Sequence, residues 1–182
     1  MIDLLVSLPL ALPPVAIGYF LLLILGREGY IGGSLHNVLG IDVVFTWVAA
    51  TLAAAVVSFP LMARSMMVAI EGVDSRLEAS ARSLGAGPLR AFFTVTFPLA
   101  YSGILAGLLL GFVRALSEFG ATIIVAGNIP GRTQTLPLAI FTSVQTGDNE
   151  VALRLVLVSI GLAIVTLLVH NWLLERARVK SS

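Results

Sequence analysis

The chain has 182 residues, of which 58% are hydrophobic and 12% charged, and its mean hydropathy is +1.00. A soluble domain carries about 25% charged residues, so an ordinary soluble globular protein is excluded. The net charge of +1 gives no indication of a basic surface that would bind nucleic acid. The sequence has no Cys, and His36 and His170 are its only histidines, which excludes a disulfide framework, thiolate metal sites and a His-rich metal cluster. The lipid bilayer is the remaining solvent to consider.

Four apolar stretches are long enough to cross a bilayer, which takes about 20 apolar residues. Three of them contain no charged residue: residues 43–63, 91–113 and 155–174. The fourth, residues 4–26, contains Pro9, Pro13 and Pro14, which remove backbone donors and predict a kinked helix. A cleaved signal peptide is the alternative for this segment, but Asp3 stands where a basic region is expected.

Lys and Arg are unevenly distributed between the connecting segments. Residues 64–90 hold four arginines and the C-terminal tail three basic residues, whereas residues 27–42 hold one arginine. The positive-inside rule therefore predicts that residues 64–90 and the C-terminus are cytoplasmic. Residues 114–154 must then begin and end on the outer side. Prolines and glycines interrupt this segment, so we expect a re-entrant or extracytoplasmic excursion that lines a pathway.

A short helix is predicted inside the cytoplasmic segment. Asp74 or Ser75 can cap its N-terminus, and Gly85 can end it. Its small side chains would let another protein approach closely, and Glu78 could orient the contact. An amphipathic turn lying on lipid headgroups is the alternative.

Several motifs carry a family resemblance. Glu78-Ala79-Ser80-Ala81, Gly85 and Val95-Thr96-Phe97-Pro98 resemble the cytoplasmic Glu-Ala-Ala loop of ABC importer membrane subunits, with the glutamate one residue earlier than in the general pattern. The stretch from Ser117 to Thr122, which contains Glu-Phe-Gly, and residues 127–137 are similar to the oxyanion branch of that family. The resemblance is greatest to molybdate permeases, and sulfate/thiosulfate permeases share part of it.

This resemblance implies an all-α polytopic membrane protein with the type I ABC importer transmembrane fold. Residues 1–182 would form one transmembrane domain, with the coupling loop at residues 64–90 and four clear transmembrane helices plus the interrupted segment. The family has at least one more helix before residue 4, so we expect this chain to lack the first family helix.

The resemblance also implies the partners. The protein would be a homodimer in the cytoplasmic (inner) membrane, with two ATP-binding subunits beneath it and an extracytoplasmic molybdate-binding protein above it. The chain has no P-loop motif, so it would be no enzyme and hold no cofactor, and the partner ATPase would bind ATP and Mg.

Three groups of residues are candidates for function. The expected ATPase-coupling residues are Glu78, Ala79, Ala81, Gly85 and Pro98. The candidates for the translocation pathway, or for docking of the binding protein, are Ser117, Glu118, Thr122, Asn128, Arg132 and Thr133. A double Gly-x-x-x-Gly pattern for close helix packing is formed by Gly103, Gly107 and Gly111. The pattern fits packing inside one protomer and a dimer seam equally well.

Two charged positions on the outer side need separate interpretation. Arg114 and Glu118 lie one helical turn apart, which favours a structural ion pair. Arg132 could attract a dianion or contact the binding protein, although an ordinary exposed arginine is the alternative. No tight substrate cage is expected, because an importer pore should hold its anion weakly.

Other functions remain as alternatives. An intramembrane enzyme would need a paired base or carboxylates at membrane depth, which the three charge-free spans do not contain. A stand-alone anion channel or carrier would have no use for an ATPase-docking loop. Tungstate and sulfate are tetrahedral dianions like molybdate, so the substrate among these three is left open.

Overall fold

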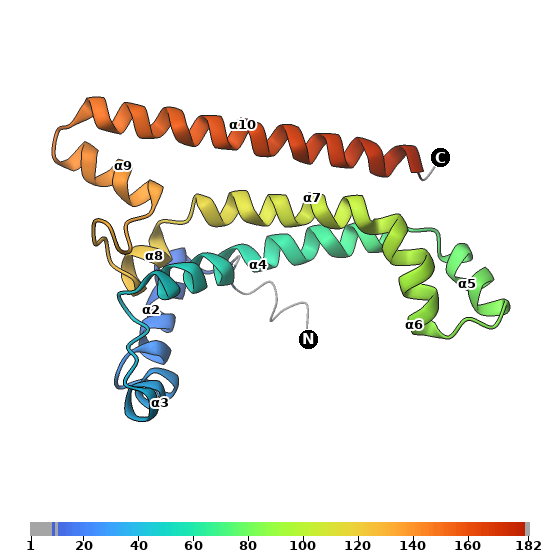
Figure 1. Cartoon of the computed structure of the whole chain (residues 1–182), viewed down its shortest axis with the longest axis horizontal. Helices are drawn as coiled ribbons and strands as arrows, with labels where there is room; N and C mark the ends of the chain where they lie inside the picture. Colours follow the sequence, from blue (N-terminus) through green and yellow to red (C-terminus); the bar gives the residue numbers. More distant parts are fainter. Residues whose placement is uncertain (1–8, 10, 181–182) are drawn as a thin grey trace. The chain divides into compact units, whose positions relative to one another are not determined.

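A computed structural model describes residue 9 and residues 11–180, with side chains up to residue 175, and all regular elements in this part are helices (Figure 1). In chain order they are α2 (Pro14–Leu25), α3 (Tyr30–Leu39), α4 (Trp47–Glu71), α5 (Ser75–Ser83), α6 (Pro88–Ala91), the π-helical η1 (Phe92–Thr96), α7 (Phe97–Leu116), α8 (Gly120–Val125), α9 (Leu136–Gln145) and α10 (Asn149–Lys180). The chain divides into two compact units, Met1–Pro60 with Val113–Leu162 and Leu61–Phe112 with Ala163–Ser182.

Three helical segments of the described chain are long and apolar enough to cross a membrane: Trp47–Glu71, Pro88–Leu116 and Asn149–Glu175. The second and third contain the predicted stretches 91–113 and 155–174, whereas the first begins four residues later than the predicted stretch 43–63. The predicted all-α membrane protein is confirmed. The helices continue beyond the charges taken as span ends. The helix α4, for example, runs on past Arg64 to Glu71, because an arginine is a good helix former and its long side chain can reach the interface.

The first predicted span is interrupted where its prolines lie. Residues 12 and 13 are not helical, and α2 begins at Pro14, which needs no backbone N–H in the first helical turn. Residues 4–8 and residue 10 of this span lie outside the described residues. A second break follows α2, where the axis of α3 is bent by 41°. The helix α3 was not predicted; counted with α2 as one bent span, it would bring the candidate spans to four.

The core of the first unit consists of small side chains from α2, α4 and α8. Its buried apolar residues are Ile17, Ala49, Ala50, Ala53, Val57, Ala121, Val125 and Ala126. Gly18 completes this packing, since a Cβ there would lie 2.7 Å from the carbonyl oxygen of Ala121. Small residues let helix backbones approach closely, which is how helices associate in a bilayer.

The predicted interrupted segment is present in the same unit. Two short helices, α8 and α9, are separated by residues 126–135, which contain two glycines with positive φ, Gly127 at 71° and Gly131 at 72°. The helix α10 begins directly after Asp148, whose Oδ1 accepts a hydrogen bond from the backbone N–H of Val151 over 3.2 Å. No helix of membrane-crossing length lies between α7 and α10, as predicted.

In the second unit the chain changes direction between α6 and α7 (Figure 1). The backbone N–H of Phe97 bonds to the carbonyl of Phe92, five residues earlier, which makes η1 a π-helical turn. Pro98 follows directly and has no N–H to offer the carbonyl of Thr94. The bend therefore lies at the entry of the third span, next to Pro98.

Candidate functional site

The predicted cytoplasmic helix is present as α5. The carboxylate of Asp74 caps its N-terminus by accepting a hydrogen bond from the backbone N–H of Arg76 over 2.9 Å. Gly85 follows its C-terminus with φ of 90°, and the N–H of Ala86 bonds back to the carbonyl of Ala81 over 3.1 Å. Both caps are local features of the sequence, and this explains why they could be predicted.

The expected coupling residues do not all face the same way. Ala79 and Gly85 are exposed, Ala81 is half-buried, and no atom lies within 4 Å of a Cβ built at Gly85. Glu78 is directed into its own chain, because its Oε2 lies 3.3 Å from Oγ1 of Thr96. Most of the other residues of α5 are exposed, so the helix offers an open surface to another protein.

The three glycines of α7 pack against α4 within one chain. A Cβ at Gly103 would lie 2.6 Å from Cβ of Ala69, and a Cβ at Gly111 would lie 2.7 Å from Cβ of Met62. A Cβ at Gly107 would lie 3.2 Å from atoms of the intervening turn of α4. Of the two interpretations left open by the sequence, packing inside one protomer is the one that the structure supports.

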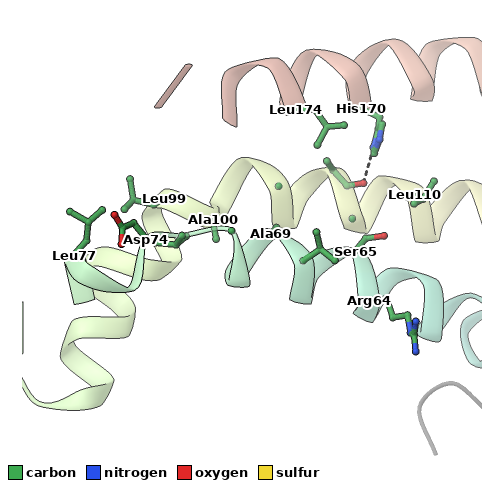
Figure 2. A pocket seen from close by; sticks show the side chains of 16 residues that line it. Arg64, Ser65, Ala69, Asp74, Leu77, Leu99, Ala100, Leu110, His170 and Leu174 are labelled. Atoms are coloured by element: carbon green, nitrogen blue, oxygen red, sulfur yellow. Dashed lines mark hydrogen bonds between the residues drawn. The ribbon is translucent and has the colours of Figure 1, made fainter. Parts of the chain in front are cut away.

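A groove of about 720 Å³ lies in the second unit, between α4, α7, α10 and the start of α5 (Figure 2). Its wall is mostly aliphatic. Nδ1 of His170 lies 3.0 Å from the carbonyl oxygen of Ala106, and this bond ties α10 to α7. Figure 2 shows Arg64 pointing away from His170, so the two side chains do not converge on a common ligand. His170 therefore has a structural role.

The predicted ion pair at the C-terminal end of α7 is confirmed. Nη1 of Arg114 donates to Oε2 of Glu118 over 2.9 Å, and Glu118 is only 2% exposed. The second carboxylate oxygen of Glu118 accepts a hydrogen bond from the backbone N–H of Ala121 over 2.9 Å. This carboxylate thus fixes the start of α8 relative to the end of α7. Of the other candidates here, Thr122 is buried and Ser117 is exposed.

Asn128 and Thr133 hold the turn that follows α8. Nδ2 of Asn128 donates to Oγ1 of Thr142 on α9 over 2.7 Å, and Oδ1 of Asn128 accepts from Gln134 over 3.0 Å. The backbone N–H of Ile129 donates to Oγ1 of the buried Thr133 over 3.1 Å. Arg132 is exposed on this turn. The turn is thus rigidly built and presents one cation to its surroundings.

Some partners of these residues were not identified from the sequence. Thr142 lies 14 residues from Asn128 and Thr96 lies 18 residues from Glu78, and no local pattern links residues that far apart. The same holds for Arg27, whose Nε donates to Oδ1 of Asp42 over 2.9 Å. This hydrogen bond lowers the pKa of Asp42 below its usual value.

The sequence as a whole matches one family model. Residues 1–179 match the model described as binding-protein-dependent transport system inner membrane component. The chain therefore belongs to this family and is a multi-pass permease subunit of a membrane transport system.

Three relatives show which transport proteins this chain is similar to. The chain is 50% identical, over its whole length and 80% of the relative, to the molybdenum transport system permease protein ModB of Escherichia coli K12. It is 48% identical to the protein of the same name in Haemophilus influenzae, over 96% of the chain and 77% of the relative. Sulfate permease 2, chloroplastic, of Chlamydomonas reinhardtii is 36% identical over 97% of the chain and 48% of the relative.

Proposed function

We propose that this chain is the permease subunit of an ATP-driven importer that moves molybdate across the cytoplasmic membrane. The observation that carries the proposal is the identity of 50% to a molybdenum permease over the entire chain. The motif from Ser117 to Thr122 builds the buried joint between α7 and α8, and residues 127–134 build the rigid outer turn. Both stretches are therefore structural parts of the outward segment.

The geometry of α5 supports an ATPase partner. The helix α5 is capped, has exposed small residues and lies in the chain between two membrane-spanning helices. Another protein can bind such a helix and move it as a rigid body. We propose that two copies of this chain pair with two ATP-binding subunits, which bind ATP and Mg and contact α5. In this arrangement α5 and the C-terminus are cytoplasmic.

The outer turn supports a partner on the opposite side. Arg132 is exposed on a turn that is fixed by Asn128 and Thr133. A fixed cation can attract a dianion or pair with a carboxylate of a docked protein. We propose that an extracytoplasmic binding protein delivers the oxyanion at this turn, and that the permease itself holds the anion weakly.

Sulfate is the second candidate substrate, because a sulfate permease is 36% identical over nearly the whole chain. Uptake of labelled molybdate by cells that carry this chain as their only molybdate permease separates the two. We expect a tenfold excess of unlabelled sulfate to leave molybdate uptake nearly unchanged. Equal competition by sulfate would reject the molybdate assignment, and equal competition by tungstate would extend it to tungstate.

Docking of the ATPase on α5 has its own test. Gly85→Trp places a large side chain on the exposed end of α5 and forces a non-glycine residue to φ of 90°. Gly147→Trp is a matched control, since Gly147 also has positive φ, at 78°, and open space around it, but follows α9. We expect only Gly85→Trp to abolish co-purification of the ATPase. Loss with both variants, or with neither, would contradict docking at α5.

A further inference from the structure

Glu78 of α5 and Thr96 of η1 meet side chain to side chain within the second unit. Oγ1 of Thr96 donates to Oε2 of Glu78 over 3.3 Å, across a separation of 18 residues. Thr96 is 4% exposed and Glu78 is half-buried. A hydroxyl so well shielded from water needs a partner inside the protein, and Glu78 supplies it.

The contact with Glu78 lies at the junction of η1 and α7. Thr96 is the last residue of η1, and α7 begins at the next residue. The π-helical hydrogen bonding of η1 and the missing N–H of Pro98 both loosen the backbone ladder here, and such π-helical turns are often found at functional sites. The contact with Glu78 therefore acts at the bend from which α7 departs.

The covalent route from α5 to the same bend is less direct. It passes through residues 84–87, which include Gly85 with φ of 90° and Gly87, and no atom lies within 4 Å of a Cβ built at either glycine. An exposed, glycine-containing connection transmits displacement poorly, because it can absorb motion by local rotation. The side-chain contact bypasses this connection.

We propose that Glu78 and Thr96 form a strut that passes displacement of α5 to the start of α7. Glu78 is then a positioning residue within this chain. The inference rests on the proposed function, in which the ATPase moves α5, and it assigns to the buried Thr96 a role in coupling ATP hydrolysis to transport.

The chemistry of the strut predicts which substitutions matter. Thr96→Val keeps the shape of the side chain but removes the donor, whereas Thr96→Ser keeps the hydroxyl. Glu78→Gln keeps an acceptor oxygen but removes the charge, whereas Glu78→Ala removes both. Because 3.3 Å is long for an O–H···O bond, we expect an effect of roughly fivefold rather than a complete loss.

The functional test uses the complete importer, reconstituted in vesicles with its ATPase and binding protein, and measures molybdate transported per ATP hydrolysed. We expect Thr96→Val and Glu78→Ala each to lower this ratio roughly fivefold, and the double variant to be no worse than either. Thr96→Ser and Glu78→Gln should stay near the unaltered protein. A normal ratio for Thr96→Val would overturn the strut. So would an equal loss for Glu78→Gln and Glu78→Ala, which would point to a charge contact with a partner.

A second measurement does not depend on transport. Because the chain has no cysteine, the pair E78C and T96C can be joined by a short bifunctional thiol reagent in membranes without any partner subunit. We expect efficient cross-linking of this pair and little of S80C with T96C, since Ser80 is exposed on α5. If E78C and T96C did not cross-link, the contact between residues 78 and 96 would be contradicted. If the unaltered importer moved no molybdate while the pair still cross-linked, the proposed function alone would fail.

Discussion

Gly103 packs against Ala69 with no room for a side chain. A Cβ at Gly103 would lie 2.6 Å from Cβ of Ala69, where two carbon atoms in contact need about 3.5–4.0 Å. Gly103→Ala therefore forces α7 away from α4 by roughly 1 Å or distorts both helices. The methyl group of Ala69 has no rotamer into which it could retreat.

The magnitude follows from two opposing terms. Overpacking of this kind costs about 1–3 kcal/mol, and replacing a helical glycine by alanine gains up to about 1 kcal/mol in helix propensity. Gly161 of α10 offers the matched control, because no atom lies within 4 Å of a Cβ built there. Gly161→Ala should show the propensity gain alone, so the two variants should differ in free energy of unfolding by about 1–3 kcal/mol.

Reversible unfolding in mixed lipid and SDS micelles, followed by circular dichroism, measures this difference. Ala69→Gly should rescue Gly103→Ala, because it removes the atom that the new methyl group meets. The reasoning is refuted if Gly103→Ala is as stable as Gly161→Ala, or if Ala69→Gly gives no rescue. A loss of dimer without any loss of protomer stability would place the glycines at a dimer seam instead.

Three further predictions concern the first unit. Glu118→Ala leaves a partly buried arginine unpaired and one α8 N–H without its acceptor, so the free energy of unfolding should fall by about 1–3 kcal/mol. Thermal unfolding in detergent measures this change, and an unchanged Tm would contradict the role of Glu118 in joining α7 to α8. Gly127→Ala combines φ of 71° with a contact of 3.2 Å to Cδ1 of Phe45, so it should destabilise more than Gly147→Ala, which has positive φ but open space. Asp42 has a lowered pKa, so its ion pair stabilises the fold above the usual pKa of 3.8 and is lost as pH falls through the lowered value. The protection factors of the α3 amides, which are corrected for the intrinsic exchange rate at each pH, should therefore fall only in acid, and Asp42→Asn should remove that dependence; a fall near neutral pH would contradict it.

The parts of the fold that were predictable depend on local sequence. Uninterrupted apolar stretches locate the three long spans, because each helix satisfies its own backbone and needs only its own residues to be apolar. The helix α5 could also be predicted from the sequence, since its cap residue Asp74 and its terminating Gly85 adjoin it. The pair of Arg114 with Glu118 follows from a single helical turn.

The remaining features depend on residues that folding brings together. The bonds from Asn128 to Thr142 and from Thr96 to Glu78 join side chains of different elements, 14 and 18 residues apart, well beyond the three or four residues that separate neighbours on one helix. The helix α3 carries Gly32 and Gly33, which disfavour a helix locally. A Cβ at Gly32 would lie 2.0 Å from the carbonyl oxygen of Leu25, so the close packing at this position leaves no room for a side chain. Tertiary packing therefore overrides the local preference at α3.

Accumulation of labelled molybdate in sealed vesicles tests the central claim most directly. The vesicles would contain this chain, its ATPase and its binding protein, and uptake would be measured with ATP and with a non-hydrolysable ATP analogue. We expect molybdate to accumulate above its external concentration only with ATP, because an importer must couple each transport cycle to hydrolysis. Equal uptake with the analogue, stopping at the external concentration, would contradict the account and identify a channel or passive carrier.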